Sequence, residues 1–373
     1  MYIFFSHLEN VYRFQIKNSK LCFISKKEYS LFLEDDKLCE GVKSFIFHPN
    51  CIIFRNNLME ILKYDLLLNK TSLLFSGYSF GEKIFNKNLI ICNKWILEEL
   101  VSKFIYDFVA EKELKQIIDN PAIISSEQII YYSLDNITLL NWDDETLWQY
   151  SVSEIGKYTD TDNYSKPYQH EGEVRKIIGV CGDILLVVIS GGFEGKNNVS
   201  SQLIGLSCQS GELLWGLDMF DANGIRTTYG SYENLQIDEP NKRLLGFYSQ
   251  GFIEIAIETG IVERFKHLSY STGEELLRFE FKDKILTNVY SETLVEEHLY
   301  FKATNIANRR HSLSSNVIGA YNHQTETIDW LYEFEDLAPS VSIKESPTVE
   351  GNRLYVLDSG GTLHIFERED VNS

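Results

Sequence analysis

The feature that most constrains the fold is a hairpin-like unit that recurs along the chain, seen best in LIGLSCQSGELLWGL at 203–217. Two apolar runs flank a polar turn at 209–211, and Trp215 follows the turn glycine by four residues. Apolar runs separated by a short turn containing Gly are typical of an antiparallel hairpin. A chain made of copies of this unit is predicted to be a repeat fold of small antiparallel sheets.

Copies of the unit can be counted along the chain. The stretches around Trp148 and Trp330 match it most clearly, and Phe265 takes the Trp position in another copy. Repeats of roughly 35 to 55 residues with several strands each indicate a β-propeller. The units begin near Phe45, Lys83, Pro121, Val174, Glu233, Lys284 and Ser346. The sequence therefore predicts an all-β, seven-bladed β-propeller of four-stranded antiparallel blades, forming a single domain over residues 1–373.

The two ends of the chain are predicted to meet in one blade. The last unit, SPTVEGNRLYVLDSGGTLHIFERED at 346–370, stops after its third strand. A final blade that lacks its outer strand is commonly completed by the other terminus. Residues 1–33 carry short apolar segments, so we expect them to complete the last blade and close the ring. Within 82–118, a strand pair and a helix both remain open, because ILEELVSKFIYDF also matches helical spacing.

The composition indicates which partners and which cellular compartment to expect. Aromatic residues make up 13% of the chain, which favours strands. The chain has 35 Lys and Arg against 54 Asp and Glu, and a net charge of −19 repels nucleic acid and anionic membranes. We expect neither as a partner.

The N-terminal residues do not follow the pattern of a secretory signal, and the six cysteines form no C-x-x-C pair. We therefore expect a cytoplasmic protein with buried, reduced thiols.

The repeats resemble the PQQ-like, or quinoprotein-type, propeller repeat, whose form is P-x-V-x-x-G-x-x-Y-V followed by G-x-L-x-A-x-D-x-x-T-G-x-x-x-W. The unit at 346–370 is most similar, and the stretches ending at Trp148, Trp215 and Trp330 resemble the second half. The resemblance implies the fold. It says little about function, because such repeats occur in quinone-dependent dehydrogenases, an outer-membrane assembly lipoprotein and many binding scaffolds.

The dehydrogenase activity of that family is not expected in this chain. Those enzymes hold a quinone and calcium and use a vicinal cysteine disulfide and an aspartate base, whereas this sequence has no adjacent cysteines and no recognisable cofactor motif. We therefore expect no cofactor. The repeat tryptophans are interpreted as packing residues between adjacent blades rather than as cofactor-stacking residues.

Four long segments are predicted to decorate one rim of the propeller. In a four-stranded meander, the loop from the second to the third strand and the loop to the next blade emerge on the same face. The long segments are of these two classes: 156–173, 191–202, 218–233 and 303–315. Long loops on a rigid scaffold tend to carry binding residues, and Tyr and Arg are enriched in interface hot spots. The predicted partner-binding residues are Tyr158, Tyr164, Tyr168, His170, Phe193, Arg226, Tyr229, Tyr232, Arg309, Arg310 and His311.

No catalytic or metal-binding residue is predicted. The eight histidines show no H-x-x-x-H spacing, and the paired carboxylates at 143–144 and 296–297 lie in or near predicted turns. The glycines of SGGFEG at 190–195 precede a strand and not a helix, which argues against a phosphate-binding loop.

The sequence favours a non-enzymatic, monomeric scaffold that binds a protein partner through the long loops. Bacterial proteins that resemble it include immunity and accessory factors. The alternative is a small-molecule binder or a hydrolase- or lyase-type enzyme that uses the central funnel. A funnel site needs converging polar groups in a deep pocket, whereas a protein partner needs a broad surface with aromatic and Arg side chains.

Overall fold

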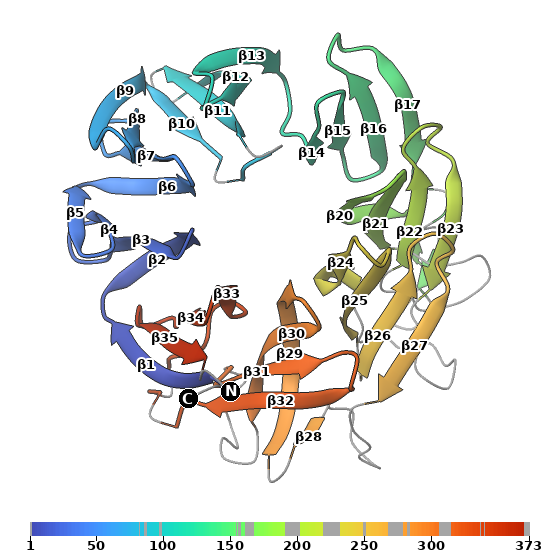
Figure 1. Ribbon diagram of the computed structural model, residues 1–373. Coiled ribbons are helices and arrows are strands. Elements are labelled where there is room, and N and C mark those ends of the chain that lie inside the picture. Colours follow the sequence, from blue (N-terminus) through green and yellow to red (C-terminus); the bar gives the residue numbers. More distant parts are fainter. Residues whose placement is uncertain are drawn as a thin grey trace. The chain divides into compact units, whose positions relative to one another are not determined.

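The computed structural model describes residues 2–368 except 82, 86–87, 97–98, 154, 156–157, 161–167, 191–201, 219–231, 249–250, 268–278, 282–283, 306–314, 336 and 339. The described residues form antiparallel sheets and one short 3₁₀ helix, η1 (Tyr232–Asn234) (Figure 1). Among them, no helix has the length and apolar character needed to span a membrane.

The chain divides into two compact units, which are described separately. Unit 1 comprises residues 130–348, and unit 2 comprises residues 2–129 together with 349–373. The division falls inside strand β15, and the sheet that contains this strand is described with unit 1.

Unit 2 contains four four-stranded sheets. One is β2 (Val11–Lys17), β3 (Lys20–Ser25), β4 (Leu31–Leu33) and β5 (Asp36–Cys39). The next is β6 (Val42–His48), β7 (Cys51–Asn56), β8 (Glu60–Asp65) and β9 (Lys70–Ser76). A third is β10 (Tyr78–Phe80), β11 (Leu89–Ile96), β12 (Glu99–Asp107) and β13 (Lys112–Ile117). The fourth joins β1 (Tyr2–Leu8) to β33 (Thr348–Glu350), β34 (Arg353–Leu357) and β35 (Leu363–Arg368).

Unit 1 contains four further sheets and one hairpin. The first is β14 (Ile123–Ile124), β15 (Gln128–Tyr132), β16 (Asn136–Asn141) and β17 (Thr146–Ser151), followed by the hairpin of β18 (Tyr158–Asp160) and β19 (Tyr168–His170). The second is β20 (Glu173–Cys181), β21 (Ile184–Ser190), β22 (Gln202–Ser207) and β23 (Leu213–Asp218). The third is β24 (Gln236–Asp238), β25 (Arg243–Tyr248), β26 (Gly251–Ala256) and β27 (Val262–His267). The fourth is β28 (Phe279–Phe281), β29 (Lys284–Val295), β30 (His298–Asn305), β31 (Val317–Asn322) and β32 (Thr327–Glu333).

The prediction of seven blades is wrong, because the described residues form eight blade-type sheets. The sheet that was missed is β2–β5, of which three strands lie inside the segment 1–33 that was assigned to closing the ring. A last blade with three strands needs only one strand from elsewhere. The remaining apolar segments near the N-terminus therefore form a blade of their own.

The last sheet is completed by a single N-terminal strand. Strand β1 pairs antiparallel with β35, from Tyr2 opposite Arg368 to Leu8 opposite Leu363, with one irregularity between Phe4 and Ser6. This pairing bears out the prediction that N-terminal residues supply the missing outer strand. It limits the segment responsible to 2–8 rather than 1–33.

Segment 82–118, where strand and helix both remained open, forms strands. The pattern that matched helical spacing falls largely in β12, which pairs with β11 on one side and β13 on the other. Its buried residues Phe104, Ile105 and Tyr106 are consecutive, because β12 packs on both faces. A run of this kind cannot be told from a buried helix by periodicity alone.

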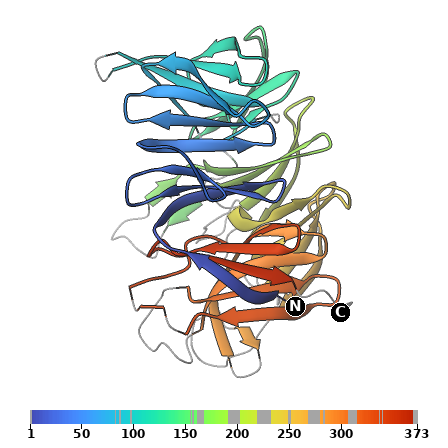
Figure 2. The same ribbon diagram turned by 60° about the vertical axis from the view of Figure 1, so that its left-hand side comes forward.

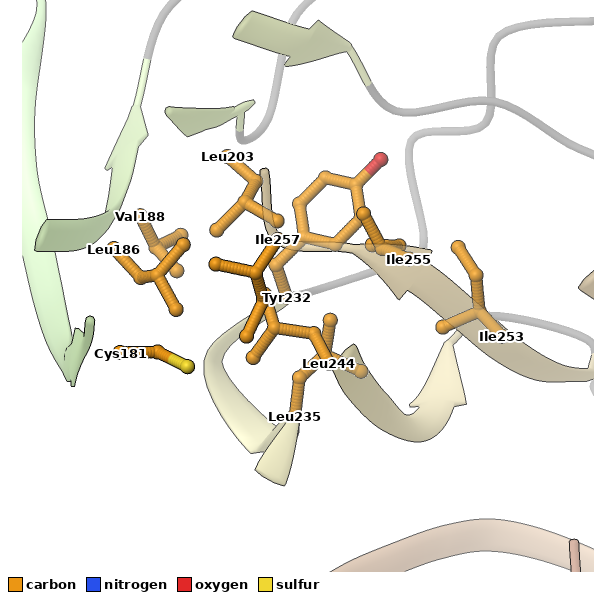
Figure 3. Packing of buried hydrophobic residues seen from close by; sticks show 10 residues of the cluster. All are labelled: Cys181, Leu186, Val188, Leu203, Tyr232, Leu235, Leu244, Ile253, Ile255 and Ile257. Carbon is orange, nitrogen blue, oxygen red and sulfur yellow. The ribbon is translucent and has the colours of Figure 1, made fainter. Parts of the chain in front are cut away.

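The cores lie between successive sheets. In unit 2, the sheets β2–β5, β6–β9 and β10–β13 lie in layers (Figure 2), and apolar clusters fill the spaces between them. In unit 1, Leu186, Val188 and Leu203 of one sheet pack towards Leu244 and Ile253 of the next (Figure 3). Each blade therefore buries its apolar faces against its neighbours, because a single four-stranded sheet cannot cover both of its own faces.

Two tryptophans of unit 1 lie in equivalent positions between sheets. Trp148 Nε1 donates a hydrogen bond to the carbonyl oxygen of Cys208 at 2.8 Å, and Trp215 Nε1 donates one to that of Ile257 at 2.8 Å. Each indole lies against a turn glycine of the next sheet, Gly211 (φ 72°) or Gly260 (φ 68°). A Cβ at Gly260 would lie 2.5 Å from the Trp215 ring. The turn glycine is therefore required both by its positive φ and by the indole that covers it.

Candidate protein-binding edge

Each sheet of unit 1 has one end with short turns and one end with long connections. Because neighbouring strands are antiparallel, the turns between first and second strands and between third and fourth strands lie at the same end. In unit 1 these turns are 125–127, 142–145, 182–183, 208–212, 239–242, 257–261, 296–297 and 323–326. None is longer than five residues. The other connections leave from the opposite end.

The short-turn ends of successive sheets lie on one side of unit 1. Trp148 stands just after a short turn of its own sheet and contacts the short turn of the next sheet at Gly211, and Trp215 repeats this contact at Gly260. The following pair of sheets is joined by Lys266, whose Nζ donates to the carbonyl oxygen of Glu326 in the β31–β32 turn at 3.1 Å. It follows that the long connections also share one side.

We call that side the long-connection edge of unit 1. The connections that leave it and exceed ten residues are 152–172, 191–201, 219–235, 268–278, 306–316 and 334–347. They include the four long segments identified in the sequence. The hairpin β18–β19 is built within the first of them, and its base is closed where Gly172 N–H donates to the Ser153 carbonyl oxygen at 3.1 Å.

The structure places only some of the predicted partner-binding residues. In the β18–β19 hairpin, the backbone register sets Tyr158 opposite His170 and Asp160 opposite Tyr168, so three of the predicted residues come together there. Seven others lie outside the described residues: Tyr164, Phe193, Arg226, Tyr229, Arg309, Arg310 and His311. Their assignment to the site remains a prediction.

Tyr232 is not an exposed binding residue. It lies in η1, its side chain is fully buried, and it packs with Leu235, Leu244 and Ile255 in the core between two sheets (Figure 3). A buried ring in this position anchors the end of the connection to the core. The nearby Lys176 Nζ donates to the Glu233 carbonyl oxygen at 2.6 Å and fixes the same segment from outside.

The connection 306–316 has a buried polar clamp at its base. The Asn305 N–H donates to Asn316 Oδ1 at 2.9 Å, and Asn305 Nδ2 donates to the two Glu333 carboxylate oxygens at 3.0 and 3.1 Å. Asn316 Nδ2 also donates to Glu333 Oε1 at 3.3 Å. These three side chains hold both ends of the segment that carries Arg309, Arg310 and His311. Sequence reasoning missed the clamp, although an Asn at each end of a predicted loop was a visible signal.

A second polar network links two neighbouring sheets of unit 1. Glu254 is buried within an apolar strand and accepts hydrogen bonds from Arg243 and from Arg264, whose Nε lies 2.9 Å from Oε2. Arg264 and Lys266 also reach Glu326 of the next sheet. The hydrogen bond from Lys266 is the main cause that lowers the pKa of Glu326. The lone Glu in GFIEIAI was a sequence signal for such a network, because a buried carboxylate must be paired.

Beside this network, two titratable side chains are shielded from solvent. His323 stacks on Phe252 at a centroid distance of 6.2 Å, and burial lowers the pKa of its imidazole. Burial also raises the pKa of the Tyr321 hydroxyl. Among the described residues, no group of three or more His, Cys, Asp or Glu side chains is arranged to hold a metal ion. The charged groups of this network connect neighbouring sheets.

Acidic residues are frequent in both the short turns and the long connections of unit 1. Unit 1 as a whole contains 17 Lys and Arg against 33 Asp and Glu. Acidic residues occur in most of the short turns: Asp143, Asp144, Glu145, Asp183, Glu212, Glu239, Glu258, Glu296, Glu297 and Glu326. The sequences of the long connections contain twelve Asp and Glu of their own, together with basic residues that include Arg226, Arg309 and Arg310.

Comparison with known proteins identifies the fold. No family model matches the chain, and no curated protein matches it in sequence. Among solved structures, the chain is similar to Sqt1 from Saccharomyces cerevisiae (TM-score 0.55, 10% identity, 99% of this chain and 98% of that chain). It is also similar to BamB from Moraxella catarrhalis (TM-score 0.53, 10% identity, 98% of this chain and 100% of that chain). The computationally designed Ika8 protein gives a TM-score of 0.52 at 10% identity, with 96% of both chains covered. These similarities establish a β-propeller fold, in agreement with the repeat analysis.

Proposed function

We propose that this chain is a non-enzymatic scaffold that binds another protein through the long-connection edge of unit 1. The observation that carries the proposal is the one-sided distribution of the connections: six segments of more than ten residues leave one end of consecutive sheets, while the other end has turns of five residues or fewer. Evolved binding sites are commonly built from long loops on a rigid scaffold. The comparisons with known proteins support the rigid scaffold, because they show a β-propeller fold. They show nothing about a partner.

The anchoring of the connections supports the proposal further. The Asn305–Asn316–Glu333 clamp and the buried Tyr232 each fix the base of a connection in the protein interior. A loop whose ends are fixed loses less conformational freedom when it binds, so less of the interaction energy is spent on ordering. All six cysteines are free thiols, and we propose that the protein works in a reducing compartment such as the cytoplasm.

Site-specific photo-crosslinking in native cells tests the proposed edge. A photoreactive residue placed at Phe193, Arg226 or Arg309 reports on three different long connections, and one placed at Asp144 or Glu297 reports on the short-turn end. We expect the same protein to be crosslinked from at least two long connections and from neither short turn. Equal crosslinking from the short turns would contradict the proposal.

A matched pair of variants then tests the basic residues. The double variant Arg309→Ala, Arg310→Ala should reduce recovery of the crosslinked partner by about tenfold, because Arg side chains are frequent hot spots. Lys242→Ala in the β24–β25 turn removes an exposed basic side chain, which pairs with Glu258, from the opposite end. It should leave recovery unchanged. Recovery that is insensitive to the double variant would remove these two residues from the site.

A further inference from the structure

Unit 2 carries an exposed apolar hairpin that the proposed function does not use. At the tip of the β11–β12 hairpin, Trp95 pairs with Leu100 and Ile96 with Glu99. Ile96 and Val101 are 50% and 54% exposed, and Trp95 and Leu100 are also on the surface. Successive residues of a strand point to opposite faces, so both faces of this tip are apolar.

The hairpin is fixed close to its tip by hydrogen bonds to the neighbouring strand. Trp95 N–H donates to the Gly77 carbonyl oxygen at 3.0 Å, and Trp95 Nε1 donates to Ser79 Oγ at 2.8 Å. Gly77 N–H and Tyr78 N–H both donate to the Met59 carbonyl oxygen, at 2.9 and 3.1 Å. This junction brings the β7–β8 turn, with Leu58 76% exposed, beside the hairpin. We call Leu58, Trp95, Ile96, Leu100 and Val101 the hairpin patch.

A cluster of exposed apolar side chains on a hairpin with a fixed backbone needs an explanation. Exposed hydrophobic residues that occur singly are normal, but a cluster that includes Trp marks an interaction surface. The burial of these side chains against a partner would be favourable. The loss of conformational entropy would be small, because the backbone is already fixed. The charged residues around the hairpin patch indicate which partner it fits.

The charges on the hairpin point to a second copy of the chain. Glu99 lies near the tip, and Lys94 and Lys103 lie further down the same two strands. Among the described residues, none of these three has an ion-pair partner; Lys94 lies only over the Tyr78 ring at 5.8 Å. By the strand register, Lys94 and Glu99 lie on the same face as Ile96, and Lys103 lies on the other face. Two such hairpins packed through the Ile96 face in opposite directions would place each Glu99 near Lys94 of the other hairpin. The surface is thus complementary to itself.

The distribution of charge over the chain favours this location for self-association. Unit 1 has 17 Lys and Arg against 33 Asp and Glu, whereas unit 2 has 18 against 21. Like-charged surfaces repel, so unit 1 of one molecule disfavours approach by unit 1 of another. Unit 2 is close to neutral and presents no such barrier.

We propose that the hairpin patch is a self-association surface, through which two copies of the chain form a two-fold symmetric dimer. In such an isologous contact, the same patch is used by both molecules, and every pair of contacts occurs twice. Ile96 lies at its apolar centre, and Glu99 with Lys94 on the same face sets its direction. This replaces the monomer expected from the sequence.

Sedimentation equilibrium of the full chain tests the apolar part of the surface. The wild type should dimerise at micromolar concentration, and the double variant Ile96→Ser, Val101→Ser should weaken dimerisation by at least about tenfold. Both side chains are half-exposed, so circular dichroism should show an unchanged fold. The control Leu67→Ser, Leu68→Ser changes two residues of the β8–β9 turn that are 87% and 74% exposed, and it should leave dimerisation unchanged.

Charge reversal tests the direction of the contact. Glu99→Lys alone and Lys94→Glu alone should each weaken self-association, because each places like charges opposite one another. Mixing the two variants should restore a heterodimer, seen by native mass spectrometry. The proposal is overturned if the wild type is monomeric at about 100 μM, if the hairpin variants dimerise like the wild type, or if the mixture gives no heterodimer. None of these variants lies in unit 1, so the crosslinking test of the proposed function is independent of the result.

Discussion

Units 1 and 2 are built from the same kind of four-stranded sheet and differ in what they present to solvent. Unit 1 carries the six long connections and a large excess of carboxylates. Unit 2 has shorter connections and little net charge, and among the described residues it exposes sixteen large hydrophobic side chains against seven in unit 1. The comparison shows that sheets of the same four-stranded type can present loops and charge in one region and apolar surface in another.

The packing contacts that join neighbouring sheets also differ between the two units. In unit 1, Trp148 and Trp215 are each fixed by a hydrogen bond and by a turn glycine of the next sheet. In unit 2, the joint between β6–β9 and β10–β13 is made by contacts among the rings of Phe75, Tyr78 and Phe104. An indole ring that packs directly on a glycine fits in only one position. Packed phenyl rings can shift and still fill the space between sheets.

The largest expected effect is at an indole joint. Trp215→Ala removes the ring and its hydrogen bond to Ile257, and it should lower the free energy of unfolding by about 3–5 kcal/mol. Phe75→Ala at the joint in unit 2 should cost about 2 kcal/mol, because neighbouring rings can shift into the space. Urea denaturation measures both, with Leu213→Ala on the surface as control. An equal or greater loss for Phe75→Ala would break the contrast between the two joints.

A smaller loss is expected at the buried carboxylate that unit 1 uses between sheets. Glu254→Gln leaves Arg243 and Arg264 without their shared anion, and it should destabilise the protein by about 2 kcal/mol, less than for a fully buried pair because both arginines reach solvent. Glu263→Gln removes only the exposed partner of Arg243 and should cost less than about 0.5 kcal/mol. Thermal unfolding compares the two variants. Similar losses would show that burial of Glu254 does not matter.

The Asn305–Asn316–Glu333 clamp of unit 1 should affect local stability in one connection. Asn316→Ala removes two of the hydrogen bonds that close the base of 306–316, and it should cost about 1 kcal/mol. The effect should be concentrated in this connection, with faster proteolytic cleavage between 306 and 315. Asn136→Ala at the start of β16 lies at a short loop and is the control. Unchanged cleavage would show that the clamp does not fix the loop.

The smallest expected effect is a dependence on pH from His323. Burial lowers the pKa of its imidazole in the folded protein, so between about pH 6.5 and the lower folded value the unfolded chain binds more protons. Stability should therefore be complete above about pH 6.5 and should fall as the pH drops below it. The groups that act on His323 are Glu254, Arg264, Asp238 and Glu297. His323→Gln should flatten the fall measured between pH 7 and 5, and an unchanged slope would contradict this origin.

Much of the fold could be predicted from the sequence, because most blades carry their own turn and strand signals. The seven predicted starting points each lie near the first strand of a sheet. The blade β2–β5 was missed because β4 and β5 have three and four residues, too few to show alternation. Whether a strand belongs to a new blade or completes an old one depends on which strand it pairs with, and local pattern does not determine that.

The candidate site was predictable only in part. The lengths of the long segments and the antiparallel rule place them at one end of the sheets. Tyr232 was misassigned because the ring enters the core through η1 immediately after a long polar segment. The Asn305–Asn316–Glu333 clamp and the Glu254 network join residues up to 28 and 62 positions apart, so their partners cannot be read from local sequence. The hairpin patch was missed because its tip also fitted a helix.

The pairing of β1 with β35 has a consequence for synthesis on the ribosome. Residues 2–8 leave the exit tunnel long before their partner strand, 363–368, is translated. Until then, β1 has no native edge to join. A stop codon or proteolytic cut only a few residues before 363 would remove the whole partner strand and leave that edge open to other nascent chains.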